Sequence, residues 1–71
     1  MHPLEKYLKS RNVTQSQLAK KLNITPQTVA NYIKGRRCPT LSIAYKIQEI
    51  TRDEVTMREL HLWHKENIHN E

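Results

Sequence analysis

Two closely spaced helix-start signals within residues 14–37 constrain this chain more than any other feature of its sequence. Thr14 with Gln17 three residues later has the capping-box pattern, in which each of the two side chains accepts a backbone N–H of the other residue. Thr25 followed by Pro26 is a second start signal, because threonine caps helices and proline suits their first position. Two helices therefore begin only eleven residues apart, so the first must be short.

The two helices are expected to span about residues 15–22 and 26–34. Asn23 lies between them and tolerates the left-handed backbone conformation that a sharp turn requires. Gly35 is a natural end for the second helix, because glycine is favoured just past a helix C-terminus. A helix-turn-helix over about residues 14–35 is therefore predicted.

Further helices are indicated on both sides of this segment. An apolar stripe marks a first helix over residues 3–10. Thr56 with Glu59 is another capping box and begins a fifth helix, while residues beyond about Asn67 are expected to fray. No segment favours a strand, so the predicted fold is all-α with five helices. Thr40 caps the fourth helix, whose inner stripe is expected to consist of Leu41, Ala44, Ile47 and Ile50.

The length and composition indicate one small domain. A chain of 71 residues buries only about 60% of its unfolded surface, so its stability is marginal without a partner. The single cysteine cannot form an internal disulfide, which favours a reducing compartment. No apolar run reaches the length of about 20 residues that spans a bilayer, and no signal-peptide pattern opens the chain. We therefore expect a cytoplasmic protein with no membrane partner.

Charge is unevenly distributed along the chain. Residues 1–46 contain nine Lys or Arg and one acidic residue, a net of +8, whereas residues 47–71 contain three basic and six acidic residues, a net of −3. The cationic part contains the predicted helix-turn-helix. A basic surface restricted to one segment is typical of proteins that follow a phosphate backbone, so double-stranded DNA is the expected partner.

The segment resembles the helix-turn-helix of the Cro and repressor proteins of lambdoid phages, and that of related YdaS-like antitoxin-type regulators. The resemblance covers roughly residues 4–63 and implies a five-helix, lambda-repressor-like DNA-binding domain. Asn23 departs from it where the family often has Gly, and Pro26 occupies a position that frequently carries a base-contacting polar residue. The matching residues are Thr14, Gln15, Leu18, Ala19, Leu22, Asn23, Val29, Tyr32, Gly35, Arg36 and Arg37, followed by the run from Ile47 to Leu60.

The second helix of the motif is the candidate for base recognition. Gln27 and Asn31 have amide side chains of the kind that pair with adenine in the major groove, and the Thr28 methyl suits a thymine methyl. The resemblance implies base contacts for Gln27 and Asn31 and a phosphate contact for Gln15. Lys20 and Lys21 are as compatible with a solvated surface as with DNA contact. The candidates for phosphate contact are Lys9, Arg11, Gln15, Thr25, Lys34, Arg36 and Arg37.

A homodimer on a palindromic operator is expected, because one recognition helix contacts only a few base pairs. The C-terminal quarter carries more apolar residues than one helical face can bury. A dimerisation segment is therefore placed at about residues 52–66, with interface residues Val55, Met57, Leu62 and Trp63.

The predicted function is a transcriptional regulator, a Cro-like phage or prophage repressor with no enzymatic activity and no small-molecule substrate. Alternatives are an antitoxin that binds a toxin through its C-terminal segment, and an accessory domain without DNA contact. His61 and His64, with His69 or Cys38, do not complete a recognised metal-ligand pattern, so no metal or other cofactor is expected. Packing in the core is favoured over nucleic-acid stacking for Tyr7, Tyr32 and Tyr45.

Overall fold

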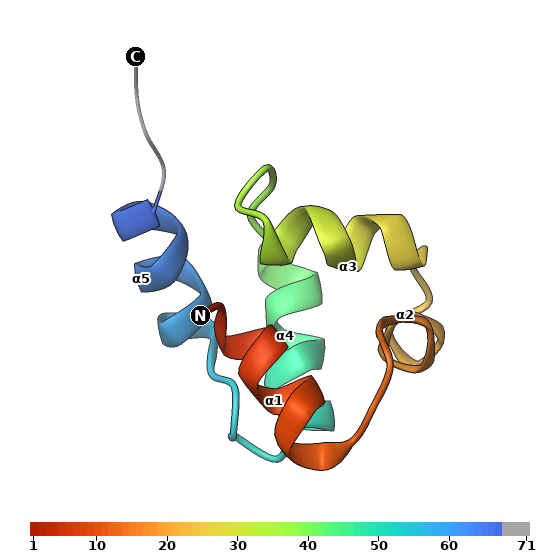
Figure 1. Ribbon diagram of the computed structural model, residues 1–71. Coiled ribbons are helices and arrows are strands. Elements are labelled where there is room, and N and C mark those ends of the chain that lie inside the picture. The colour runs from red at the N-terminus through yellow and green to blue at the C-terminus, as the bar shows by residue number, and fades with distance from the viewer. Residues whose placement is uncertain (68–71) are drawn as a thin grey trace.

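Residues 1–67, which the computed structural model describes, form five α-helices and no strands. This confirms the all-α prediction (Figure 1). The expected fraying beyond Asn67 and the candidate ligand His69 lie outside the described residues. The helices are α1 (Pro3–Arg11), α2 (Gln15–Leu22), α3 (Pro26–Ile33), α4 (Leu41–Ile50) and α5 (Met57–Asn67).

Side-chain caps determine where the helices begin. At α2 the predicted capping box is complete, with the Thr14 hydroxyl accepting the Gln17 N–H at 3.1 Å and the Gln17 side chain accepting the Thr14 N–H at 3.0 Å. The same reciprocal pair forms between Thr56 and Glu59 at α5, with distances of 3.1 and 3.0 Å. Threonine hydroxyls also cap α3 and α4 as predicted. The cap of α1 is His2, whose Nδ1 accepts the Leu4 N–H at 3.0 Å, and the sequence patterns did not indicate it.

Residues in the left-handed backbone conformation follow α1, α2 and α3. Asn23 has φ = 60° after α2, as expected, and Asn12 does the same after α1 with φ = 57°. In both places the next N–H donates back to a carbonyl of the last turn, at 3.0 and 2.9 Å. Gly35, with φ = 78°, follows α3 and lets the Arg36 N–H reach the Asn31 carbonyl at 2.9 Å. The loop after α3 is therefore fixed to the end of α3.

The helices enclose one apolar core. Figure 1 shows α5 at one side of the molecule with the N-terminus next to it; α5 contacts both α4 and α1, and α1 also contacts α3. α2 packs mainly against α3, which is the helix-turn-helix arrangement. None of the helices within residues 1–67 is long and apolar enough to cross a membrane. The core consists of Leu4, Leu8, Leu18, Ala19, Leu22, Val29, Tyr32, Ala44, Ile47, Val55 and Leu60.

The inner stripe predicted for α4 is partly wrong. Ala44 and Ile47 are buried, but Leu41 is 75% exposed. An α-helix turns about 100° per residue, so residues spaced by three drift about 60° at each step. Leu41 and Ile50 therefore lie on opposite sides of α4. Tyr45, one turn after Leu41, is 52% exposed, so its expected packing in the core is also wrong.

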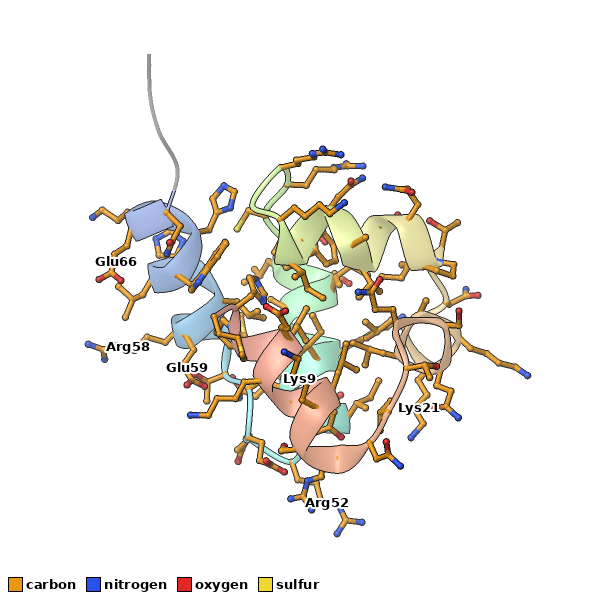
Figure 2. The ribbon with its side chains drawn as sticks, in the orientation of Figure 1. Lys9, Lys21, Arg52, Arg58, Glu59 and Glu66 are labelled. Carbon is orange, nitrogen blue, oxygen red and sulfur yellow. The ribbon has the colours of Figure 1, made fainter. Side chains whose placement is uncertain are left out.

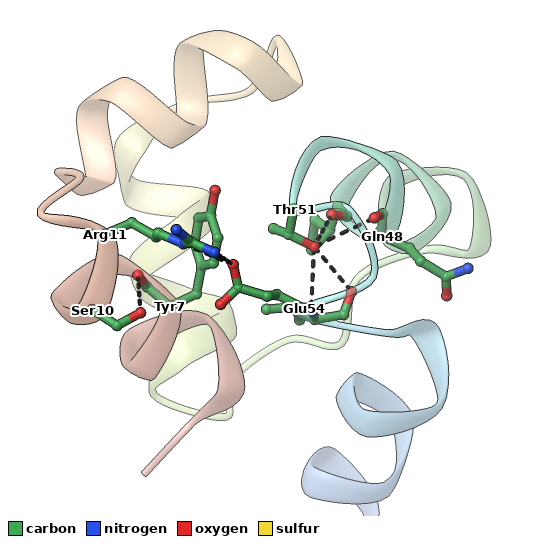
Figure 3. A network of polar contacts seen from close by, with 8 residues as sticks. Tyr7, Ser10, Arg11, Gln48, Thr51 and Glu54 are labelled. Atoms are coloured by element: carbon green, nitrogen blue, oxygen red, sulfur yellow. Dashed lines mark hydrogen bonds and ion pairs between the residues drawn. The ribbon is translucent and has the colours of Figure 1, made fainter.

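The connection from α4 to α5 is held by polar side chains (Figure 3). The buried Thr51 hydroxyl donates to the Ile47 carbonyl at 2.7 Å and accepts the Val55 N–H at 3.1 Å. Gln48 accepts the Met57 N–H at 3.0 Å, which attaches the first turn of α5 to α4. These bonds set the direction in which α5 leaves the connection.

Two of the four predicted interface residues are engaged within the chain. Val55 is only 2% exposed and belongs to the core, so its side chain has almost no surface to offer a partner. Trp63 is half-buried, and its ring meets the His2 ring edge-on at a centroid distance of 4.4 Å. A Cβ on Gly35 would lie 3.3 Å from the Trp63 ring. Trp63 therefore packs between the start of α1 and the turn after α3. Of the remaining two, Met57 is half-buried and Leu62 is 41% exposed.

Candidate nucleic-acid interface

α3 separates an apolar inner side from a polar outer side. Val29 and Tyr32 are buried against the other helices. Burial raises the pKa of the Tyr32 hydroxyl, and the charge of the nearby Arg37 opposes part of that increase. The three predicted base contacts lie on the outer side, with Gln27 exposed and Thr28 and Asn31 half-buried. The position of this polar face agrees with the sequence prediction.

Side-chain hydrogen bonds join the polar residues of the outer face into two couples, Gln27 with Asn31 and Thr25 with Thr28. Gln27 Nε2 donates to Asn31 Oδ1 at 3.1 Å. Thr25 Oγ1 lies 2.9 Å from Thr28 Oγ1 and also accepts the Thr28 N–H at 3.2 Å. The Thr28 hydroxyl therefore takes part in the helix cap, and its methyl makes no demand on a hydrogen-bond partner. The sequence analysis predicts a contact for each residue alone, although the four-residue spacing of Gln27 and Asn31 is the signal for such a pair.

Three predicted phosphate-contacting cations surround the C-terminal end of α3. Lys34, Arg36 and Arg37 are all exposed, and within residues 1–67 none of them lies within 4.0 Å of a carboxylate. Figure 2 shows polar side chains extending from α3 and from the loop after it, away from the other helices. In the same view Arg52 lies at the opposite end of the molecule, so it is remote from this face. Three exposed cations beside an uncharged polar face form a surface suited to a polyanion.

Two other predicted phosphate contacts have acidic partners within the chain. Lys9 lies 4.0 Å from Glu5 on the same face of α1. The Arg11 guanidinium binds Glu54 through both Nε and Nη2, with the Nε–Oε1 distance 2.7 Å (Figure 3). The hydrogen bond to Glu54 and its charge raise the pKa of Arg11 above its ordinary value. Arg11 therefore joins α1 to the α4–α5 connection, a role that was not predicted from the sequence.

The remaining predicted contacts lie at the starts of the two motif helices. Gln15 is the first residue of α2 and is exposed, and Thr25 caps α3. Lys20 and Lys21 are also exposed, and Figure 2 shows Lys21 projecting from α2 away from α3. Its direction favours a solvated position for Lys21 over one on the α3 face.

Comparison with known proteins identifies the family. A helix-turn-helix family model, HTH_3, matches residues 4–54, which include α2 to α4 and all of α1 except its first residue, and exclude α5. The chain belongs to this helix-turn-helix family. An HTH-type transcriptional regulator of Methanocaldococcus jannaschii, itself uncharacterized, is 43% identical to the chain over 44 residues, which are 62% of this chain and 67% of that protein. No solved structure matches the chain.

The candidate metal ligands do not come together in the described part of the chain. No group of three or more His, Cys, Asp or Glu side chains in residues 1–67 has the arrangement of a metal site. Cys38 is exposed in the loop after α3, whereas His64 is half-buried beside His2. His61 and Cys38 both border a shallow apolar groove between α4 and α5.

Proposed function

We propose that this helix-turn-helix protein is a sequence-specific DNA-binding transcriptional regulator that places α3 in the major groove. The observation that carries the proposal is the outer face of α3, where uncharged amide and hydroxyl side chains are flanked by exposed cations that have no carboxylate within 4.0 Å among residues 1–67. Amides suit base edges and cations suit phosphates, so the two halves of one surface have distinct roles. The transcriptional-regulator name of the similar archaeal protein supports the same function.

Gln27, Thr28 and Asn31 are the proposed base contacts, and Lys34, Arg36 and Arg37 the principal phosphate contacts. Gln15 and Thr25 would contact phosphate from the N-terminal ends of α2 and α3, where the helix dipole favours an anion. Lys9 and Arg11 would have to exchange a carboxylate for a phosphate. Because ion pairs between exposed side chains are screened by water and contribute little, that exchange costs little.

The protein is further proposed to act in the cytoplasm as a Cro-like repressor of phage or prophage type, bound as a homodimer to a palindromic operator. The surface that favours dimerisation lies on α4, where Leu41 and Tyr45 form an exposed stripe beside the α4–α5 groove. This groove is lined by Cys38, Pro39, Leu41, Ala44, Met57, Arg58, Leu60 and His61. A second copy is the proposed occupant, because one α3 contacts too few base pairs for operator selectivity and a two-fold pair doubles them.

Selection of DNA from a random pool by the purified protein tests this function. A regulator of this kind should enrich one motif with two inverted halves about one helical turn apart, roughly 34 Å between centres. Enrichment of no motif, together with no binding of duplex DNA at low salt, would favour an accessory domain that acts through protein contacts. A second polypeptide that co-purifies with the chain through its C-terminal segment would favour the antitoxin alternative.

A further inference from the structure

The side-chain amides of Gln27 and Asn31 form a pair rather than two independent groups. They are four residues apart, so they lie on the same face of α3, and Gln27 Nε2 donates to Asn31 Oδ1 at 3.1 Å. Gln27 is exposed and Asn31 is half-buried. The less accessible residue of the couple therefore restrains the more accessible one.

The hydrogen bond determines what each amide can offer to a base. A primary amide has two N–H donors and one carbonyl acceptor. The bond uses one N–H of Gln27, which keeps its Oε1 acceptor beside its second N–H donor. At Asn31 it uses one of the two lone pairs of the carbonyl oxygen and leaves both N–H groups free of this bond. The couple thus has an acceptor and a donor side by side at Gln27, whereas the Asn31 oxygen is partly committed to Gln27.

Adenine is the base that matches the Gln27 end. In the major groove, adenine presents an N6 donor next to an N7 acceptor, whereas guanine presents two acceptors. The free Oε1 of Gln27 complements N6, and its free N–H complements N7. A lone Gln side chain samples several rotamers and loses that freedom on binding, but the bond to Asn31 restrains it before DNA arrives.

We propose that Gln27 and Asn31 act on DNA as one recognition unit, in which Gln27 contacts an adenine and Asn31 is the positioning residue that orients the Gln27 amide. This rests on the proposed DNA-binding function and specifies its ligand as an A·T pair within each half-site. It also replaces the separate base contact that the sequence predicts, and that is proposed above, for Asn31, so that within this couple only Gln27 contacts a base. Two side chains then serve one operator position.

A double-mutant cycle on the selected operator tests the proposal. Gln27→Ala, Asn31→Ala and the double variant are titrated against the operator and against versions with the A·T pair replaced. Both single variants should lose discrimination at the same position, by about 5- to 150-fold, and the double variant should lose no more than Gln27→Ala alone. Losses at two different positions that multiply in the double variant would overturn the coupled unit.

Asn31→Asp separates positioning from direct contact. Aspartate keeps an oxygen that can accept the Gln27 N–H but has no N–H to offer a base. Discrimination at the A·T position should therefore survive, while affinity for every sequence falls because of the added negative charge near phosphate. Loss of discrimination in Asn31→Asp would show instead that Asn31 contacts a base through its N–H groups.

Two controls keep this result distinct from failure of the proposed function. Lys34→Ala, at the end of the same helix, should weaken binding to all sequences equally and leave discrimination intact. Unchanged thermal midpoints would verify that the variants fold. If the unmodified protein selects no motif, the DNA-binding proposal itself fails, whereas a selected motif with independent effects of the two residues contradicts only the coupled unit.

Discussion

His2 is a buried histidine that acts as a helix cap, and this combination makes it sensitive to pH. Its Nδ1 must be unprotonated to accept the Leu4 N–H, and the ring packs against Trp63. Burial, the facing His64 and the N-terminal ammonium together lower the pKa of His2 to about 4. An unfolded chain has the ordinary histidine value near 6.5. The unfolded state therefore binds a proton at a pH where the folded state does not.

Stability should consequently fall as the pH decreases from about 6.5 toward 4. Above 6.5 the ring is neutral in both states and its contribution to stability is complete, whereas below 6.5 protonation favours the unfolded chain. His2→Asn is the matched variant, because asparagine is a good N-cap that does not titrate. Urea midpoints measured at pH 7 and pH 5 should differ less for His2→Asn than for the unmodified protein. Equal differences would mean that other groups cause the pH dependence.

Arg36 and Arg37 are proposed to contact DNA phosphates through their charge, without contacting a base. Each is exposed, and their loop is tied to α3 through the Arg36 N–H and the Asn31 carbonyl. Replacing either with alanine should weaken binding to all DNA sequences alike. The slope of log K against log salt should fall by about 0.9 for each phosphate that the variant no longer neutralises.

The control for this experiment is a cation away from α3. Arg52→Asn removes the same charge at the opposite end of the molecule (Figure 2), and asparagine tolerates the φ of 53° found there. Binding and salt slope should change little in Arg52→Asn. A variant of Arg36 or Arg37 that altered one base position at an unchanged slope would identify a base contact instead.

At the scale of helices, the starts of α2 to α5 were predictable because their caps are local. Four threonines each accept the backbone N–H of the third residue in the helix that they precede: Thr14, Thr25, Thr40 and Thr56. Such a signal depends only on neighbours in sequence. His2 was not predictable in this way, because its role as a cap also depends on its burial beside Trp63, sixty-one positions away.

The α2 capping box should make a measurable contribution to stability. Thr14→Ala removes the acceptor for the Gln17 N–H and should lower the free energy of unfolding by ~1 kcal/mol. Ser16→Ala is the matched control, because Ser16 is exposed in the same helix and alanine is at least as good a helix former. Denaturant titrations would compare the two. A similar loss in both variants would contradict a specific role for the cap.

In the candidate site, too, the features that depend on neighbours in sequence were predictable, and those that depend on residues far apart in sequence were not. The polar face of α3 was predictable, because helix periodicity alone places Gln27 and Asn31 opposite Val29. The Arg11–Glu54 pair was not, because it joins positions forty-three residues apart and depends on how the α4–α5 connection returns to α1. A three-residue spacing did not predict the exposure of Leu41, because the drift that accumulates along α4 turns its side chain outward.

For the whole molecule, the exposed stripe on α4 provides a surface that could hold two copies together on DNA. Leu41 contributes little to the fold of one chain, since it is 75% exposed at the start of α4 beside the α4–α5 groove. Burying a leucine side chain contributes about 1.5–3 kcal/mol, so its removal from an interface is large compared with its effect on the monomer. A substitution at Leu41 therefore tests the proposed dimer with little effect on the stability of the single chain.

Leu41→Glu should leave the thermal midpoint and binding to an isolated half-site close to those of the unmodified protein. Its affinity for the full palindrome should fall about tenfold or more, because a carboxylate resists burial in an apolar contact. Ser42→Glu adds the same charge at the next exposed position, so it controls for repulsion between glutamate and DNA. Sedimentation with operator DNA would count the bound copies. A Leu41→Glu protein that still occupies the palindrome as a pair with unchanged affinity would contradict this interface, and a loss confined to Leu62→Glu would place it on α5 instead.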